Sequence, residues 1–363
     1  MDRRAFIGSG LSALAAASLP RVVRAAAKPA EYRGFLLHLT RNMWGDYSIA
    51  EFRQAKTVKG KGISEKLYLD ESNLVRTVDH AVAGGCNLLM LDVGDAVVYP
   101  SHPEIALPDS WQPERLQKLV RRFRRQGLEV IPKLNFSATH DSWLKEYHKA
   151  LTTPKYYRVC ADLIRDAAEI FGRPKGFHIG MDEESFGHQW KYDFIVLRQR
   201  ELWWHDFNFL AGECERNGMR CWTWCSVGYD DLEGFVKRLP KGVLPTTGLY
   251  DEELEGFDMA KLRPKMLNYK CLKQMLLLDE AGFEQVPCVS NWLSPTQQKA
   301  GMKENAHATA GVVKFCREHL KPELVRGFLA APWSQCVTDA QYRYNCRGWD
   351  LLADALKETV RTL

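Results

Sequence analysis

The sequence predicts a (β/α)8 barrel, because eight strand-like segments alternate with eight helix-like segments along the chain. Parallel strands joined by helices produce this alternation, and the absence of a second composition zone favours one closed barrel over an open sheet. No Gly-x-Gly-x-x-Gly turn opens a predicted helix, and the sequence has no Walker-type phosphate loop. A doubly wound dinucleotide-binding fold is therefore disfavoured.

The predicted strands are short apolar runs, each followed by polar residues. They are Gly34–Leu39, Asn87–Val93, Leu128–Leu134, Gly176–Ile179, Met219–Trp224, Val243–Leu249, Gln285–Val289 and Leu324–Ala330. Helical spacing of apolar residues predicts a helix after each strand. These helices are Glu71–Ala83, Pro113–Gln126, Lys155–Phe171, Arg198–Arg216, Leu232–Arg238, Met266–Glu280, Asn305–His319 and Ala340–Thr362. Several end at a glycine that can adopt the left-handed conformation of a C-cap, namely Gly84-Gly85, Gly127, Gly172, Gly218 and Gly282.

The first 27 residues are expected to be an export signal, which leaves residues 28–363 as the barrel domain. Arg3-Arg4 stand before a short apolar run, and Ala25-Ala26-Ala27 form a small-residue exit. The paired arginines resemble the twin-arginine type of signal. The twin-arginine export machinery is then an expected partner, and the periplasm or the extracellular space is the expected location. A basic N-terminal helix is the alternative interpretation.

Composition excludes several other classes of protein. The formal charge of +5 is small for 363 residues, and the arginines within 121–125 follow a helical pattern that predicts a solvated helix face. We therefore expect no nucleic-acid partner. The ten cysteines include no Cys-x-x-Cys pair, so a zinc knuckle is disfavoured. Most lie inside apolar runs and are expected to be small buried residues.

The connection 42–68 is long for a first strand-to-helix loop. Functional lids and disordered surface loops both have this length, and the sequence does not separate them.

The active site of a (β/α)8 barrel lies at the carboxyl ends of its strands. The side chains expected there are His38, Arg41, Asp92, Asp95, Lys133, His140, His178, Asp182, Glu183, Trp222, Trp224, Tyr250, Trp292, Trp333 and Gln335. Flat aromatic rings suit the apolar faces of sugars, and charged groups suit their hydroxyls. The sequence therefore predicts a carbohydrate site.

The most specific segment follows the fourth predicted strand and reads His178-Ile-Gly180-Met-Asp182-Glu183. Two adjacent carboxylates in an apolar pocket cannot easily both be charged, so one of them is expected to serve as an acid. An acidic turn that binds a metal or caps a helix is the alternative.

This segment resembles the His-x-Gly-x-Asp-Glu motif of the family-20 glycoside hydrolases, the β-N-acetylhexosaminidases. The resemblance extends weakly along the barrel. Arg41 matches the arginine of the family's Asp-x-x-Arg, Asp95 the aspartate after the second strand, and His140 the histidine after the third. The sequence departs from the family at four matching positions: His38, Asp92, Lys133 and Gln335.

The resemblance implies an exo-acting enzyme that releases N-acetylhexosamine-type sugars by substrate-assisted, retaining hydrolysis. Glu183 would be the general acid and base, and Asp182 would orient the 2-acetamido group. His178 would support this pair, and Arg41 would bind hydroxyls. The aromatic residues implied around the N-acetyl group are Trp222, Trp224, Tyr250, Trp292 and Trp333. No cofactor or metal is expected, and the expected partner is an amino-sugar glycoside.

Two other functions stay open at this point. The departures at Asp92, Lys133 and Gln335 are also typical of a non-catalytic carbohydrate-binding barrel descended from such hydrolases. A metal-dependent hydrolase would use His38, Asp92, Asp95, His140 and His178. These histidines follow different strands and form no His-x-His pair, so the metal-dependent enzyme is the least favoured hypothesis.

Overall fold

A computed structural model describes residues 31–361, apart from 46–62, 191, 193–194, 251–261, 294, 300 and 302–303. The expected export signal, residues 1–27, lies outside the described residues. So does most of the long first connection.

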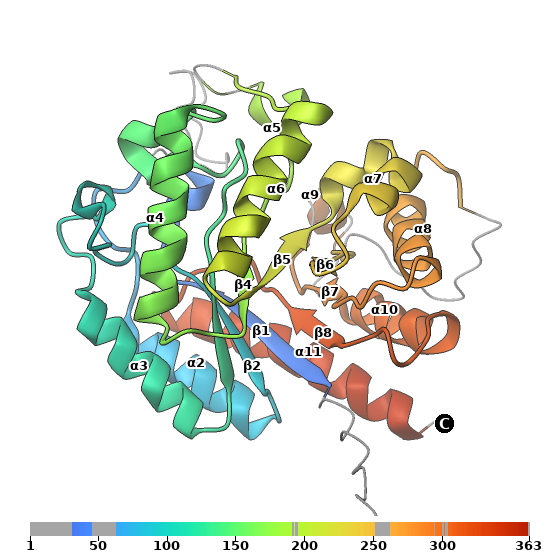
Figure 1. Ribbon diagram of the computed structural model, residues 1–363. Helices are drawn as coiled ribbons and strands as arrows, with labels where there is room; N and C mark the ends of the chain where they lie inside the picture. The colour runs from blue at the N-terminus through green and yellow to red at the C-terminus, as the bar shows by residue number, and fades with distance from the viewer. Residues whose placement is uncertain are drawn as a thin grey trace, which may run out of the picture. The chain divides into compact units, whose positions relative to one another are not determined.

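Eight parallel strands form one sheet, in the order β6-β5-β4-β3-β2-β1-β8-β7 (Figure 1). They are β1 (Tyr32–His38), β2 (Leu88–Asp92), β3 (Glu129–Lys133), β4 (Gly176–His178), β5 (Arg220–Trp224), β6 (Leu244–Thr246), β7 (Cys288–Val289) and β8 (Gly327–Ala330). A parallel bridge between Gly248 and Cys288 joins the two outer strands, β6 and β7. The sheet therefore closes, which confirms the predicted (β/α)8 barrel.

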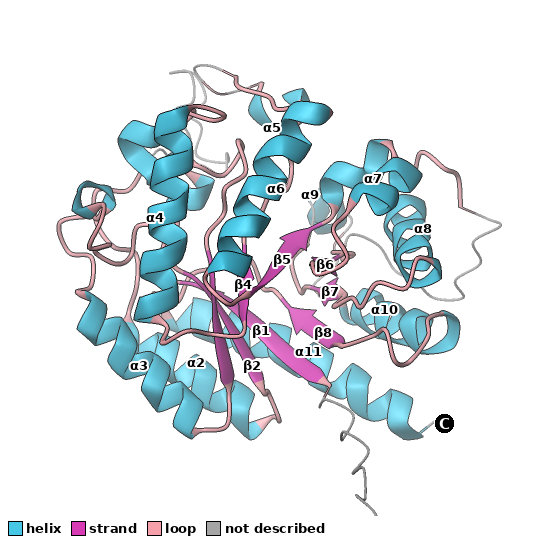
Figure 2. Cartoon of the chain, viewed as in Figure 1, coloured by secondary structure: helices cyan, strands magenta, loops and turns pink. Residues whose placement is uncertain are grey.

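Helices lie between the strands along the chain (Figure 2). They are α2 (Glu71–Ala83), α3 (Pro113–Arg125), α4 (Pro154–Ile170), α5 (Phe186–Gln189), α6 (Glu201–Arg216), α7 (Leu232–Arg238), α8 (Leu267–Glu280), α9 (Pro295–Lys299), α10 (Ala306–His319) and α11 (Asp339–Arg361). The last helix, α11, packs against both α10 and α2 and so completes the ring. Within the described ranges, no helix has the length and apolar character needed to cross a bilayer.

The predicted helices match the structure closely where apolar residues recur at helical spacing. Helix α3 buries Leu116, Leu119, Val120 and Phe123 against the barrel, while Arg121 on its other side is exposed. The spacing of three and four residues places the apolar side chains on one face. Five of the expected C-cap glycines have positive φ, with values from +63° at Gly172 to +93° at Gly85, whereas Gly84 has a φ of −79°.

Several predicted boundaries are wrong by a few residues. Strand β7 begins at Cys288 instead of Gln285, directly after Pro287, which has no N–H to donate to a sheet. Strand β6 ends at Thr246 instead of Leu249, and strand β8 begins at Gly327 instead of Leu324. Helix α6 begins at Glu201 instead of Arg198, because Arg198 is buried in an irregular segment and Arg200 has a non-helical φ of +52°.

The barrel interior contains one layer of mostly polar side chains, one from each of β1 to β5, which we call the polar belt. Strand register pairs His38 with Asp92, Asp92 with Lys133, Lys133 with His178 and His178 with Trp222. All five side chains are buried. Apolar residues on the same strands fill the barrel around this belt, among them Leu36, Met90, Ile131 and Leu329. The ten cysteines are all buried with free thiols, as the sequence predicts for most of them.

Candidate functional site

A cleft of about 1560 Å³ opens at the carboxyl ends of the strands. Most of the predicted site residues line it: Arg41, His140, Asp182, Glu183, Trp224, Tyr250, Trp292 and Trp333. Gln335 lines it as well, and so does Trp44, which belongs to the short 3-10 helix η1 (Asn42–Trp44). The structure thus brings together side chains that follow β1, β3, β4, β5, β6, β7 and β8.

The two carboxylates stand on a left-handed turn that follows β4. The φ values are +74° at Gly180, +69° at Met181 and +56° at Glu183. This conformation costs about 1–2 kcal/mol for each residue other than glycine. A Cβ at Gly180 would overlap the amide of Asn135, so the motif requires glycine at this position.

Hydrogen bonds from the loop after β3 hold this turn in place. The Asn135 amide donates to Asp182 Oδ1 over 2.9 Å, and its Oδ1 accepts from the Met181 N–H over 3.3 Å. The Ser137 hydroxyl donates to the carbonyl of Asp182, and the Thr139 hydroxyl donates to that of Glu183 over 2.6 Å. The sequence around Asn135 thus supplies the side chains that offset the cost of the turn.

Asp182 and Glu183 differ in their surroundings. Only 15% of the Asp182 side chain is exposed, whereas 43% of the Glu183 side chain is exposed. His140 Nε2 lies 3.2 Å from Glu183 Oε2 and 3.7 Å from Asp182 Oδ2. Burial lowers the pKa of His140, but the two carboxylates raise it and the net change is upward. His140 therefore links a sheltered carboxylate to one that can reach a ligand in the cleft.

Aromatic rings form a wall of the cleft. The rings of Trp224 and Trp333 are 5.5 Å apart, and Tyr250 lies 6.2 Å from both Trp333 and Trp292. Trp44 contacts the ring of His38 at 4.5 Å. The wall is therefore assembled from the first strand-to-helix loop and from the ends of four later strands. Such flat surfaces pack well against the C–H faces of a sugar.

The polar belt lies in the barrel interior, and its charges are paired. Lys133 forms an ion pair with Asp92, and His38 Nδ1 lies 3.2 Å from the same Asp92 oxygen. Burial raises the pKa of Asp92, but the Lys133 ammonium and His38 lower it to about 2. Burial lowers the pKa of His38. Two of the positions that depart from the family motif are thus each other's partners.

Like His38, Asp92 and Lys133, three further predicted site residues do not line the cleft. His178 accepts a hydrogen bond from the Gly180 N–H at Nδ1 and packs its ring on Trp224. Burial and the Lys133 charge hold the pKa of His178 well below its usual range. Trp222 lies within the barrel, 5.5 Å from the ring of Tyr32 at the start of β1. His178 therefore supports the turn after β4, and Trp222 fills the barrel core.

Asp95 is the third such residue. Its carboxylate accepts from Thr40 Oγ1 and from Asn42 Nδ2, each over 2.6 Å. Thr40 and Asn42 stand on either side of Arg41, so Asp95 holds the backbone that presents the arginine to the cleft. Burial raises the pKa of Asp95 to about 6, although the two hydrogen bonds oppose this change.

The five residues of the metal hypothesis do not converge. Asp92 pairs with both His38 and the Lys133 ammonium, and Asp95 is hydrogen-bonded to Thr40 and Asn42. Within the described ranges, the group that could offer three ligand atoms is instead His140 with Asp182 and Glu183, whose atoms lie within 4.8 Å of one another. Two of them, Asp182 and Glu183, are the carboxylates to which the family resemblance assigns the chemistry.

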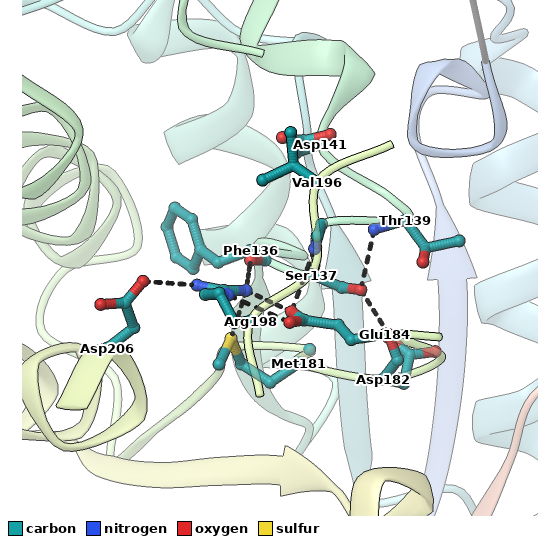
Figure 3. A network of polar contacts seen from close by, with 12 residues as sticks. Phe136, Ser137, Thr139, Asp141, Met181, Asp182, Glu184, Val196, Arg198 and Asp206 are labelled. Atoms are coloured by element: carbon teal, nitrogen blue, oxygen red, sulfur yellow. Dashed lines mark hydrogen bonds and ion pairs between the residues drawn. The ribbon is translucent and has the colours of Figure 1, made fainter. Parts of the chain in front are cut away.

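Two side chains of the site were not predicted from the sequence. Trp44 lies in the long first connection, where no periodicity marks it. Arg198 was predicted to begin a helix, yet it is buried against Glu184, which directly follows the carboxylate pair (Figure 3). The sequence signal for a buried arginine was the run of three acidic residues at 182–184, because a carboxylate that is buried needs a cation beside it.

No family model and no curated protein sequence matches this chain. Its fold is similar to that of several solved structures. The pneumococcal virulence factor StrH aligns with a TM-score of 0.60 at 14% identity, over 91% of this chain and 86% of that one. A β-N-acetylhexosaminidase from Bacteroides fragilis aligns with a TM-score of 0.58 at 12% identity, over 92% and 70%. Dispersin B aligns at 0.51 and 15%, over 79% and 94%. These similarities establish the barrel fold.

Proposed function

We propose that this protein is an exo-acting glycoside hydrolase that releases N-acetylhexosamine-type sugars. The observation that carries the proposal is the turn after β4, which presents a partly exposed Glu183 beside a sheltered Asp182. An aromatic wall faces the same cleft. The described structures of similar fold include a β-N-acetylhexosaminidase, which supports this substrate class.

In the proposed reaction, the carbonyl oxygen of the substrate's own 2-acetamido group attacks the anomeric carbon. The bond to the glycosidic oxygen breaks, and Glu183 gives its proton to the departing alcohol. Asp182 accepts a hydrogen bond from the acetamido N–H and stabilises the positive charge of the oxazolinium intermediate. The Glu183 carboxylate then takes a proton from a water molecule that adds to the anomeric carbon, so configuration is retained.

The surroundings of the pair support these roles. Asn135 donates to Asp182 Oδ1 and leaves Oδ2 facing His140 at 3.7 Å. The indole N–H groups of Trp224 and Trp333 are buried without a partner among the described residues. Two donors and an aromatic surface suit a ligand that has both hydroxyls and apolar faces.

A non-catalytic carbohydrate-binding barrel is the second candidate. Gln335 favours it, because it lines the cleft where the family motif has a carboxylate and its Oε1 accepts from Gln341 over 3.1 Å. Asp92 and Lys133 do not favour it, since they are buried in the barrel and satisfy each other's charge. Departure from the motif at these two positions therefore changes the barrel interior and not the cleft.

The deciding experiment compares Glu183→Gln and Asp182→Asn on two substrates. One is a β-linked disaccharide of N-acetylglucosamine, whose leaving alcohol needs a proton. The other is the nitrophenyl glycoside of the same sugar, which leaves without one. Glu183→Gln should lower kcat/KM by about 10²–10⁴-fold on the disaccharide and by much less on the nitrophenyl glycoside. Asp182→Asn should lower both values alike, because the acetamido group is common to both substrates.

Uniform losses in Glu183→Gln would overturn the assignment of the general acid. A wild-type protein that binds these sugars but turns over neither substrate would instead be the carbohydrate-binding barrel. A thiazoline analogue of the cyclic intermediate gives a third measure, because an enzyme binds such a ligand far more tightly than the free sugar. Equal binding of glucose and N-acetylglucosamine would contradict the proposed substrate class.

A further inference from the structure

Arg198 lies in the irregular segment before α6, beside Glu184 and Asp206 (Figure 3), and its side chain is buried. It contacts both oxygens of Glu184, with Nε donating to Oε2 over 3.0 Å and Nη2 donating to Oε1. Nη2 also donates to the carbonyl of Phe136 over 2.8 Å. On the far side, Nη1 donates to Asp206 Oδ2 over 3.1 Å. The arginine thus joins the β4 turn, the β3 loop and helix α6.

The network holds one positive and two negative groups inside the protein. The side chains of Glu184 and Asp206 are both fully buried, and Arg198 is the cation between them. Burial lowers the pKa of Arg198, but the Glu184 carboxylate and its other partners raise it well above the usual value. Asp206 also accepts from Thr152 over 2.8 Å and from the Tyr157 hydroxyl over 2.5 Å. Each charged group therefore has several partners, as a buried ion cluster requires.

Glu184 is the residue through which this cluster reaches the site. It follows Glu183 directly, and its Oε1 also accepts from the Ala138 N–H over 3.0 Å. The neighbours of Ala138 hold the carbonyls of Asp182 and Glu183, so one short segment of the β3 loop contacts three consecutive residues of the turn. The turn is left-handed at Glu183. Glu184, which follows, must be held in place if the Glu183 side chain is to keep one orientation.

We propose that Arg198 is a positioning residue that fixes the orientation of Glu183 through its two-pronged contact with Glu184. This inference rests on the proposed function, since it assigns Arg198 to the delivery of a proton by Glu183. Arg198 does not act on the substrate itself. It makes the chain after the acid rigid, so that the carboxyl group stays within reach of the glycosidic oxygen. A small displacement of a catalytic group can lower a rate by about 10²-fold.

The test uses Arg198→Lys, which keeps the charge but cannot bridge both Glu184 oxygens and the Phe136 carbonyl in one plane. If Arg198 positions the acid, kcat/KM on the disaccharide should fall by about 10–100-fold. The fall on the nitrophenyl glycoside should be several times smaller, because that leaving group needs little help from Glu183. A purely structural role would lower both values by the same factor. Glu184→Gln, which keeps an acceptor for Ala138, should show the same leaving-group dependence.

Two variants serve as matched controls. Asp206→Asn weakens the far end of the same cluster and leaves the contact with Glu184 in place. Arg220→Lys changes an arginine that pairs with Glu284 in a second ion cluster, which also includes Arg326 and lies at the start of the strands. Whatever their effect on the unfolding temperature, both controls should change kcat/KM on the two substrates by the same factor.

The outcomes separate this role from the proposed function. If wild type hydrolyses both substrates and folded Arg198→Lys shows no leaving-group dependence, the positioning role is overturned alone. If wild type hydrolyses neither, the proposed function fails and this role fails with it. If Arg198→Lys does not fold, Glu184→Gln decides: a uniform loss overturns the role, and a loss that is larger on the disaccharide supports it.

Discussion

Lys133 and Asp92 form an ion pair in the barrel interior, and neither side chain is exposed to solvent. Neighbouring strands bring them together, because strand register places Asp92 of β2 beside Lys133 of β3. The Lys133 charge and the hydrogen bond from His38 outweigh burial and lower the pKa of Asp92 to about 2. The pair explains how two charged residues can occupy the interior of a barrel that is otherwise filled by apolar side chains.

Removing one partner should therefore be costly. Lys133→Met leaves the Asp92 carboxylate buried beside a single histidine, and we expect the free energy of unfolding to fall by about 3–5 kcal/mol. Adding Asp92→Asn should restore part of this loss, because no charge is then buried without a partner. Lys155→Met, which breaks an exposed pair with Glu146, should cost less than about 1 kcal/mol. Urea unfolding at pH 7 measures these variants and the Asp92→Asn single variant, and a double loss equal to the sum of the two single losses would contradict the coupling.

Much of the fold could be predicted because its signals are local. Helix α2 and helix α7 begin and end where their apolar spacing and flanking residues predict. The cleft could be predicted for a related reason: once a barrel is assumed, the ends of its strands meet. The sequence cannot show which residue at a strand end points into the cleft. Asp95 and His178 have suitable chemistry, but each is turned toward a neighbouring backbone segment.

The sequence also does not show which residues pair with the buried charged groups. Arg198 pairs with Glu184 and Asp206 because the segment before α6 folds back over the β4 turn. No periodicity describes that segment, so its arginine was predicted to be the first residue of the helix. Pairing between Asp92 and Lys133 on neighbouring strands follows from strand register, which depends on the whole sheet.

Asp95 should make stability depend on pH. Its pKa is raised from 3.8 to about 6 in the folded protein, mainly by burial. The folded state thus holds the proton more tightly than the unfolded state, so ionisation of Asp95 destabilises the fold as pH rises from about 4 to above 6. The shift of about two pH units corresponds to roughly 3 kcal/mol.

Asp95→Asn should remove this contribution and keep hydrogen bonds to Thr40 and Asn42. Relative to the variant, wild type should lose stability as pH rises through this range, and the difference should become constant above pH 7 and below pH 4. Unfolding free energies at half-unit steps between pH 4 and pH 7.5 would test it. Parallel curves for the two proteins would show that Asp95 does not titrate in this range.

The N-terminal sequence makes a separate prediction about export. Twin-arginine signals are recognised through the arginine pair itself, so a change that keeps the charge should still block export. We expect Arg3→Lys with Arg4→Lys to retain the protein in the cytoplasm. Arg21→Lys with Arg24→Lys, the same change later in the segment, should leave export intact. Mass spectrometry of the exported protein should show an N-terminus near Lys28, and an exported species that still begins at Met1 would contradict the predicted signal.

Gly180 and Gly218 offer a matched pair for testing the β4 turn, because both have a φ of +74°. A Cβ at Gly218 would meet nothing within 4 Å, whereas a Cβ at Gly180 would overlap the Asn135 amide. Alanine at either position carries the same left-handed cost of about 1–2 kcal/mol. Only Gly180→Ala should also displace Asn135, which holds Asp182 over 2.9 Å.

We therefore expect Gly218→Ala to lower the free energy of unfolding by about 1–2 kcal/mol and to leave kcat/KM within a factor of two. Gly180→Ala should be less stable still and should lose at least about 10²-fold in kcat/KM, because the pair Asp182 and Glu183 moves with the turn. Measuring the free energy of unfolding and kcat/KM on the same glycoside for both variants separates the two effects. One is the cost of a left-handed alanine, and the other is the overlap of its Cβ with Asn135. Equal effects of the two substitutions would mean that contact between Asn135 and the turn does not hold the carboxylates in place.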